Sequence, residues 1–329
     1  MNCTIRIFQD EGIPNVLMHI KLCHFPNKGQ CSNYTNNLMS STNKSLGYLC
    51  AIIAAITYGF NPLFGLPLYA RGMSTPSVLF YRFFFASLML IGVKLYKKSS
   101  FRMEARQLPP LLASGILLAL SATFLFLSFR VMDAGIAATI LFVYPIMVAL
   151  IMAIGFHERI SFFTWGCMLV ALAGIALLNA SGGKVSLLGL VYVLLSALTY
   201  AIYMVLVKES NLKRLPSDTL TLYAMLAGLP VFLIQLKGGT LLQMPSDGIA
   251  WLCVFGLALF PALFSFLLMA VAIKRIGATS TAIIGALEPC TALVIGICVF
   301  NEHLTLRSII GIAMILVAVS LVVLSRKKS

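Results

Sequence analysis

Two ionisable side chains stand inside long apolar stretches of the sequence and are the first candidates for chemistry. Arg82 lies in the stretch 75–93, and Glu288 lies in the stretch 278–300. If these stretches cross a bilayer, each charge costs roughly 2.5–3.5 kcal/mol at a helix centre, so a protein cavity is the favoured place for it. Arg82 can attract a carboxylate, and Glu288 can hold an amino group or a proton. Two structural roles stay open: snorkelling of Arg82, and a protonated Glu288 that bonds backbone freed by Pro289.

Hydroxyl and amide side chains recur in two apolar stretches with one spacing. In each set the residues stand at i, i+1 and i+4, which brings them onto one face of a helix. Buried groups of this kind need partners, either across helices as packing contacts or in a cavity with water and ligand. The expected lining of such a cavity consists of Thr57, Tyr58, Asn61, Thr199, Tyr200 and Tyr203, with Tyr81, Tyr144 and Tyr223 as further candidates.

Two prolines stand at matching depths in matching stretches, Pro145 after Tyr144 and Pro289 after Glu288. Proline removes one backbone hydrogen bond from a helix and breaks or kinks it. Broken helices at corresponding places in two halves of a membrane protein point to a binding site. The sequence therefore predicts helix breaks at both prolines beside the candidate site, with tolerated kinks as the alternative.

Two glutamates end apolar stretches in short turns, Glu158 in HERIS and Glu302 in NEHLT. A carboxylate in such a turn can cap the next helix, because the N-terminal end of a helix carries partial positive charge. We expect this capping role first and a role as a gate second.

These residues belong to a very apolar chain. Of its 329 residues, 60% are apolar and 10% are charged, whereas soluble domains carry about 25% charge. Stretches long enough to cross a bilayer as helices recur along it, and the alternating pattern of a membrane barrel is absent. The sequence predicts an all-α integral membrane protein with ten transmembrane helices at 45–68, 75–93, 108–129, 134–155, 161–178, 187–207, 219–236, 249–272, 278–300 and 308–324.

The net charge of +14 is explained by basic residues in the loops and does not indicate a nucleic-acid-binding surface. With the N-terminus inside, most lysines and arginines fall in inner loops, as the positive-inside rule requires. Both termini are then cytoplasmic, and no nucleic acid is expected as a partner. The expected partners are the lipid bilayer, a small-molecule solute and protons as a coupling ion. A bacterial inner membrane is the expected location, since no organelle signal is visible.

The chain contains a long internal repeat. At an offset of 142 residues Tyr58 matches Tyr200, and at an offset of 144 residues Pro145 matches Pro289. Each copy holds five helices, an odd number, so the second copy must enter the membrane from the opposite side. Two such inverted repeats are typical of secondary transporters. The expected units are a polar segment 1–44, five-helix repeats at 45–178 and 187–324, and a basic tail 325–329.

The polar segment 1–44 lacks the apolar core of a signal peptide, and Met39 precedes a short polar leader as an alternative start. Its Cys3, Cys23 and Cys31 do not have the spacing of a close metal-ligand pair. The remaining cysteines lie in apolar stretches without a CxxC motif, as packing residues do. No metal and no other cofactor is expected.

Several short motifs resemble a known family of membrane proteins. The stretch Ala286-Leu287-Glu288-Pro289, followed by Asn301-Glu302 and a helix with Gly311, resembles the second EamA-type unit of the drug/metabolite transporter superfamily. Tyr144-Pro145 followed by Glu158 is similar to the first unit, and Arg82 resembles the arginine common in the second helix of that family. The resemblance covers about residues 45–324. It implies ten helices, cytoplasmic termini, a central cavity and transport of amino acids or other small metabolites, often outward. Tyr144 stands where the second unit has Glu288, so the substrate and the coupling ion stay open.

The favoured function is a secondary transporter, and more narrowly an exporter, of small metabolites such as amino acids. It would work by alternating access around a midplane cavity between the repeats, where one positive and one negative group suit a zwitterion. An intramembrane enzyme is disfavoured, because no aspartate lies in a span and His157-Glu158 lacks the second histidine of a metalloprotease motif. A non-transport scaffold or receptor, or a channel, remains as the alternative. The chain is therefore not expected to be an enzyme, and no oligomeric state is favoured.

Overall fold

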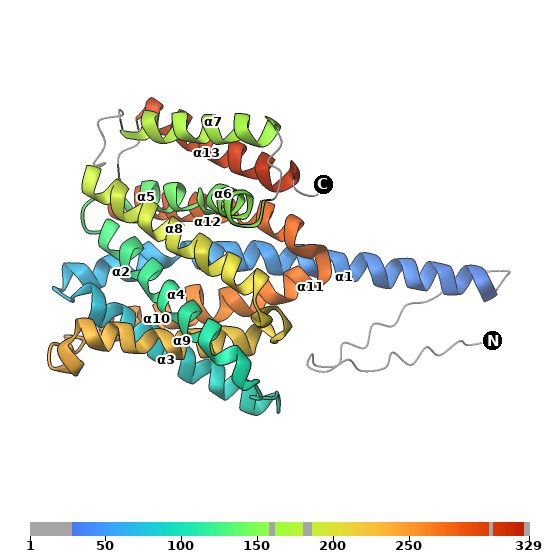
Figure 1. Ribbon diagram of the computed structural model, residues 1–329, viewed down its shortest axis with the longest axis horizontal. Coiled ribbons are helices and arrows are strands. Elements are labelled where there is room, and N and C mark those ends of the chain that lie inside the picture. Colours follow the sequence, from blue (N-terminus) through green and yellow to red (C-terminus); the bar gives the residue numbers. More distant parts are fainter. Residues whose placement is uncertain (1–27, 158–161, 180–185, 303–304, 326–329) are drawn as a thin grey trace.

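The computed structural model describes residues 28–157, 162–179, 186–302 and 305–325, and this part of the chain is built from helices. They pack as a bundle from which the first helix projects (Figure 1). The helices are α1 (Lys28–Gly59), α2 (Asn61–Ala70), α3 (Thr75–Tyr96), α4 (Leu108–Ser128), α5 (Ala134–Leu141), α6 (Tyr144–Phe156), α7 (Phe162–Asn179), α8 (Leu187–Glu209), α9 (Ser217–Gln235), α10 (Gly248–Ala258), α11 (Ser265–Ile284), α12 (Leu287–Phe300) and α13 (Leu306–Ser325).

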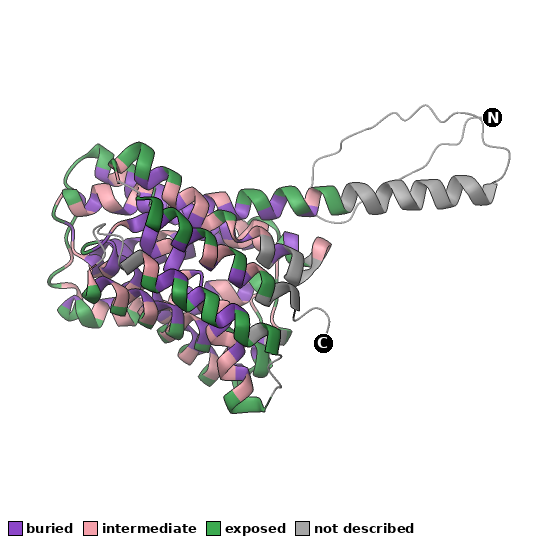
Figure 2. Cartoon of the chain, turned by 90° about the horizontal axis from the view of Figure 1, so that it is seen from above, coloured by how far each residue is buried: buried purple, intermediate pink, exposed green. Residues whose placement is uncertain are grey.

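Seven segments are long and apolar enough to cross a membrane, and three shorter apolar helices at 165–177, 287–300 and 306–321 accompany them. Large apolar side chains such as Leu88, Leu172 and Leu252 are more than half exposed on the bundle. Figure 2 shows exposed residues along the outer surface of the helices and buried ones between them. An apolar surface of this extent is a liability in water, and it suits contact with lipid.

Two helices are interrupted just ahead of the prolines singled out in the sequence. A turn at Phe142 and Val143 separates α5 from α6, so Pro145 lies in the first turn of α6. A turn at 285–286 separates α11 from α12, so Pro289 lies in the first turn of α12. The first turn tolerates proline because its backbone nitrogens have no intrahelical partner.

A third interruption, between α1 and α2 at Phe60, was not predicted from the sequence. Gly59 and Pro62 flank it, and proline is again in the first turn of the new helix. At the matching positions of the second repeat stand Ala201 and Met204, and α8 runs through them without a break. The two repeats have therefore diverged at this bend.

The segment 248–284 differs from the expected boundaries. A loop was expected at 273–277, between the predicted spans 249–272 and 278–300. The structure continues α11 to Ile284, and a π-helical turn over Leu259–Phe264 accommodates Pro261 between α10 and α11. Gly277 alone does not end a helix, whereas Pro289 fixes the interruption a few residues before itself. The N-terminal boundary differs too, because residues 28–44 of the expected polar segment belong to α1.

Contacts between the repeats come in matched pairs. A Cβ built on Gly47 would lie 2.6 Å from Ile276 Cγ2, and one on Gly189 would lie 2.8 Å from Met132 Sδ. These two contacts exchange under the offsets of 142 and 144 residues. The Ser121 hydroxyl donates to the Ser196 carbonyl at 3.0 Å. Its repeat counterpart is the bond from the Ser265 hydroxyl to the Ala54 carbonyl, also 3.0 Å.

The packing follows the same pairing of the repeats. Helix α1 lies along α11 as α4 lies along α8, and α7 packs against α13 at one edge of the bundle (Figure 1). The elements that carry the candidate site, α1, α2, α5, α6 and α12, meet inside this arrangement.

Candidate functional site

A cluster of polar side chains gathers where the interrupted helices meet. The rings of Tyr144 on α6 and Tyr200 on α8 are 4.8 Å apart and perpendicular. Tyr203 stacks on Tyr200 with 5.7 Å between the ring centroids. Tyr58 on α1 and Glu288 on α12 lie within electrostatic range of Tyr144 and Tyr200. The structure thus brings together five of the residues predicted to line a site.

Arg82 reaches the edge of this cluster from α3. Its side chain is 5% exposed, and its guanidinium carbon lies 5.5 Å from the centre of the Phe126 ring. Arg82 and Tyr58 are close neighbours, and Glu288 lies in electrostatic range of the same Tyr58. Within the described part of the chain, Arg82 and Glu288 form no ion pair. Tyr58 neighbours both charges.

A small cavity opens beside the cluster. It offers about 30 Å³ and is lined by the bend between α1 and α2, by α4, and by the interruptions ahead of α6 and α12. Its polar lining consists of Tyr58, Asn61, Tyr144 and Glu288, and the rest of the wall is mainly apolar. A site with this lining can orient a small polar group, and the surrounding apolar wall excludes bulk water.

Two expected lining residues are satisfied within their own helices. The Thr57 hydroxyl bonds the carbonyls of Ile53 and Ala54 at 2.8 and 3.0 Å. The Thr199 hydroxyl does the same one turn back on α8, with distances of 2.8 and 3.0 Å. Neither threonine lines the cavity in this conformation.

Tyr81 and Tyr223 do not join the cluster. The Tyr81 hydroxyl bonds Met244 Sδ at 3.1 Å, and the Tyr223 hydroxyl donates to the Phe101 carbonyl at 2.8 Å. Met244 and Phe101 belong to connections at opposite ends of the bundle. The two tyrosines occupy matching positions of the two repeats. These positions lie at opposite ends of the bundle, so the two side chains do not meet in one site.

Glu302 caps a helix, although not the one that follows it. Its carboxylate accepts hydrogen bonds from the backbone nitrogens of Ala134 at 2.8 Å and Gly135 at 3.3 Å, the first residues of α5. The expectation that it caps the next helix, α13, is therefore wrong. Burial raises the pKa of Glu302, and the bond from Ala134 opposes that shift. Glu158, its repeat counterpart, lies outside the described residues.

Both halves of the chain match one known protein family. Residues 45–180 and, separately, residues 187–324 match the EamA-like transporter family. The chain belongs to this family. An uncharacterized transporter of Archaeoglobus fulgidus is 28% identical over 252 residues, which cover 75% of this chain and 86% of the relative. An uncharacterized transporter of Bacillus subtilis is 22% identical over 299 residues, covering 88% and 93%.

A solved crystal structure shares the fold of this EamA-like transporter. It is 18% identical and superposes with a TM-score of 0.62 over 85% of this chain and 98% of its own. The family match and the apolar helices make the chain a multi-pass membrane transporter of a small-molecule solute, and not an enzyme. They also confirm the two repeats that the sequence predicted.

Two ion pairs of the EamA-like transporter were missed in the sequence. Lys94 is 1% exposed, and its Nζ lies 2.8 Å from Asp218 Oδ2 and 2.9 Å from Thr219 Oγ1. The predicted span 75–93 ends just before Lys94, which therefore counts as a loop charge in the sequence. Its neighbours Val93 and Leu95 are apolar. A lysine inside an apolar run, rather than after it, could have indicated a buried side chain.

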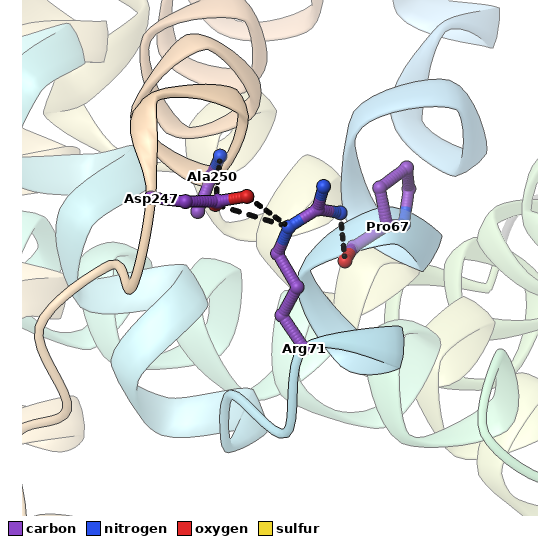
Figure 3. A network of polar contacts seen from close by, with 4 residues as sticks. All are labelled: Pro67, Arg71, Asp247 and Ala250. Carbon is purple, nitrogen blue, oxygen red and sulfur yellow. Dashed lines mark hydrogen bonds and ion pairs between the residues drawn. The ribbon is translucent and has the colours of Figure 1, made fainter.

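The second pair joins the repeats at the end of the bundle where α2 finishes. Arg71 Nε lies 3.0 Å from Asp247 Oδ1, and Arg71 Nη1 donates to the Pro67 carbonyl at 3.1 Å (Figure 3). Asp247 also caps α10 by accepting from the Ala250 nitrogen at 2.9 Å. The Ala250 bond, followed by Arg71, lowers the pKa of Asp247. No sequence pattern links two such loops.

Proposed function

We propose that this EamA-like transporter is a secondary transporter that exports small metabolites such as amino acids, by alternating access around a midplane cavity between its repeats. The observation that carries the proposal is the position of Tyr58. It neighbours the buried cation Arg82 from the first repeat and the carboxyl of Glu288 from the second. A solute that touches all three would bind between the two repeats.

Ten transmembrane helices in two inverted repeats fit the described helices. Seven long and three shorter apolar segments add up to ten, if the interrupted helices each count as one span. Inversion is supported by two contacts at one end of the bundle. The last turn of α2 reaches this end, because Arg130 lies 5.3 Å from the Tyr69 ring centroid. The first turn of α8 starts there, because Gly189 packs on Met132. The leading helices of the two repeats therefore run in opposite directions.

The distribution of basic residues supports cytoplasmic termini in a cell membrane, which we propose to be a bacterial inner membrane. The end with Arg71, Asp247 and Glu302 then faces outward. Contacts between the repeats close this end: Arg71 pairs with Asp247, and Glu302 caps α5. We propose that these contacts separate when the transporter opens outward.

The charges suit a zwitterionic solute. Arg82 would attract a carboxylate, and Glu288 would hold an amino group or a coupling proton. Interrupted helices place free backbone groups beside such a site, as in other transporters with broken helices. The 30 Å³ cavity is smaller than an amino acid, so binding requires a more open conformation than this one.

Counterflow in proteoliposomes tests the proposal. Proteoliposomes that contain the purified protein are loaded with pooled unlabelled amino acids. Single labelled amino acids are then added outside, with and without a pH gradient. We expect saturable exchange that Glu288→Gln abolishes, whereas Glu209→Gln, at an exposed helix end, leaves it unchanged. Exchange that is unaffected by both Glu288→Gln and Arg82→Ala, in protein that is folded and inserted, would refute the role of the charges. Conductance without saturation would indicate a channel, and no exchange of any pool would favour a scaffold or receptor.

A further inference from the structure

Asn61 carries a buried hydrogen-bond acceptor that has no partner. The residue begins α2 and is 4% exposed. Its side-chain nitrogen Nδ2 donates to the Tyr58 carbonyl at 2.7 Å. A carbonyl only accepts, so this bond fixes which end of the amide faces Tyr58. The amide oxygen Oδ1 must point the other way, and it makes no hydrogen bond in the structure.

An unpaired buried acceptor costs about 1–3 kcal/mol, so its presence calls for a physical explanation. Asn61 lines the cavity beside the cluster, together with Glu288. A carboxylate oxygen is also an acceptor, while the hydroxyls of Tyr58 and Tyr144 can donate or accept. Arg82 is not among the lining residues, so no side chain of fixed positive charge faces the space. The cavity therefore has more acceptors than donors.

A group that completes this cavity must supply several N–H or O–H donors and positive charge. A primary ammonium group supplies three donors and one charge in a volume close to that of water. The space of about 30 Å³ exceeds the roughly 10–15 Å³ that one water needs, so it accommodates a head group of about that size. Leu125, Phe129 and Leu141 close the rest of the wall, and they offer nothing to a larger hydrated ion.

We propose that this cavity binds the primary ammonium group of the transported solute between Asn61 Oδ1 and the Glu288 carboxylate. The inference rests on the proposed transport function and narrows it to solutes with an unsubstituted amino group. Asn61 is then a specificity-determining residue. A trimethylated amine carries the charge but no N–H, so the Asn61 acceptor would remain unpaired. A 2-hydroxy acid has one donor but no positive charge to meet Glu288.

Exchange with matched analogues tests this inference. Each labelled amino acid of the pool is compared with its N,N,N-trimethyl derivative and with its 2-hydroxy acid. We expect the wild-type protein to prefer the primary amine at least tenfold over both, equivalent to about 1.4 kcal/mol. Asn61→Leu should lower the affinity for the amine at least tenfold and leave that for the trimethyl derivative, which has no N–H, within twofold. Thr57→Val is the control, because it removes a buried polar group of α1 that does not line the cavity.

Several results would overturn the inference. They are equal exchange of the amine and either analogue, an equal effect of Asn61→Leu on the amine and its trimethyl derivative, or a sodium requirement without amine preference. Transport of solutes that lack an amine would refute the ammonium site and leave the transport function standing. No exchange by the wild-type protein would refute both. If Asn61→Leu does not insert, Asn61→Asp keeps the acceptor, and it should retain the amine while weakening the hydroxy acid at least tenfold.

Discussion

Glu302 Oε1 lies 2.8 Å from the backbone nitrogen of Ala134, so a carboxylate of the second repeat caps a helix of the first. Two glycines make room for it. A Cβ built on Gly296 would meet the Glu302 carboxylate, and one on Gly135 would lie 2.8 Å from the Leu293 Cα. Asn301, in the left-handed conformation with φ 52°, turns the chain back toward α5. Helix α5, which precedes the interruption beside the candidate site, is thus held at its start by a residue of the other repeat.

Removing this cap should destabilise the protein. Glu302→Ala leaves the first nitrogens of α5 without their acceptor, and losing a helix cap costs about 0.5–2 kcal/mol. We expect a lower melting temperature in detergent, measured by thermal unfolding of the purified protein. Gly296→Ala should do the same, because its methyl group takes the space of the carboxylate. Gly166→Ala, where a Cβ meets nothing within 4 Å, is the control. Unchanged stability in both cap variants would contradict the assignment.

The Arg71–Asp247 contact should give the stability a pH dependence. The folded state holds the pKa of Asp247 below its usual range, so between that pKa and about pH 4 the unfolded chain binds more protons than the folded one. The contribution is present above about pH 4 and is lost as the pH falls through the folded pKa. Asp247→Asn removes it.

Melting temperatures between pH 6 and pH 3 measure this effect. The difference between wild type and Asp247→Asn should shrink toward acid pH. Arg71→Gln should reduce the dependence without abolishing it, because the bond from the Ala250 nitrogen is the larger cause of the shift. A constant difference across the pH range would show that Asp247 contributes nothing through its charge.

Features set by local sequence were predictable, and features set by contacts between repeats were not. Pro145 and Pro289 announce the interrupted helices because proline lacks a backbone donor at any site in any fold. The cluster of Tyr58, Tyr144 and Tyr200 followed from helical spacing and the repeat. Glu302 ends a helix as expected, but its partner α5 lies 167 or more residues away in the chain, beyond the reach of any local pattern.

Two residues that are equivalent by the repeat do not always lie close together in the structure. A twofold axis keeps two equivalent residues together only when both lie near the axis. Tyr144 and Glu288 occupy matching places and lie close together, whereas the equivalent Tyr81 and Tyr223 bond to connections at opposite ends of the bundle. The position of each residue along its helix decides whether the two equivalents meet, and the sequence offset alone does not give that position.

Replacing Asp218, the partner of Lys94, should destabilise the protein more than replacing Lys94 itself. Asp218→Asn leaves the buried ammonium of Lys94 without its carboxylate partner, beside the Thr219 hydroxyl and the Phe101 ring. Breaking a buried pair costs about 3–5 kcal/mol, and the value here should be lower because Asp218 is 29% exposed. Lys94→Met removes the charge and keeps the volume, so it should cost less. Thermal unfolding of the two single variants and the double variant measures the order, and equal costs would contradict it.

Gly59 should control transport through the position of α12. A Cβ on this residue would lie 2.6 Å from Thr291 Cβ and 2.7 Å from the Glu288 carbonyl, so an alanine must push the start of α12 away from α1. Glu288 then moves relative to Tyr58 and Asn61, and we expect kcat/KM for exchange to fall at least tenfold, about 1.4 kcal/mol. Gly92→Ala on α3 is the matched control, because a Cβ there meets nothing within 4 Å. Exchange by Gly59→Ala at the rate of Gly92→Ala would show that the close approach of α1 and α12 is packing alone.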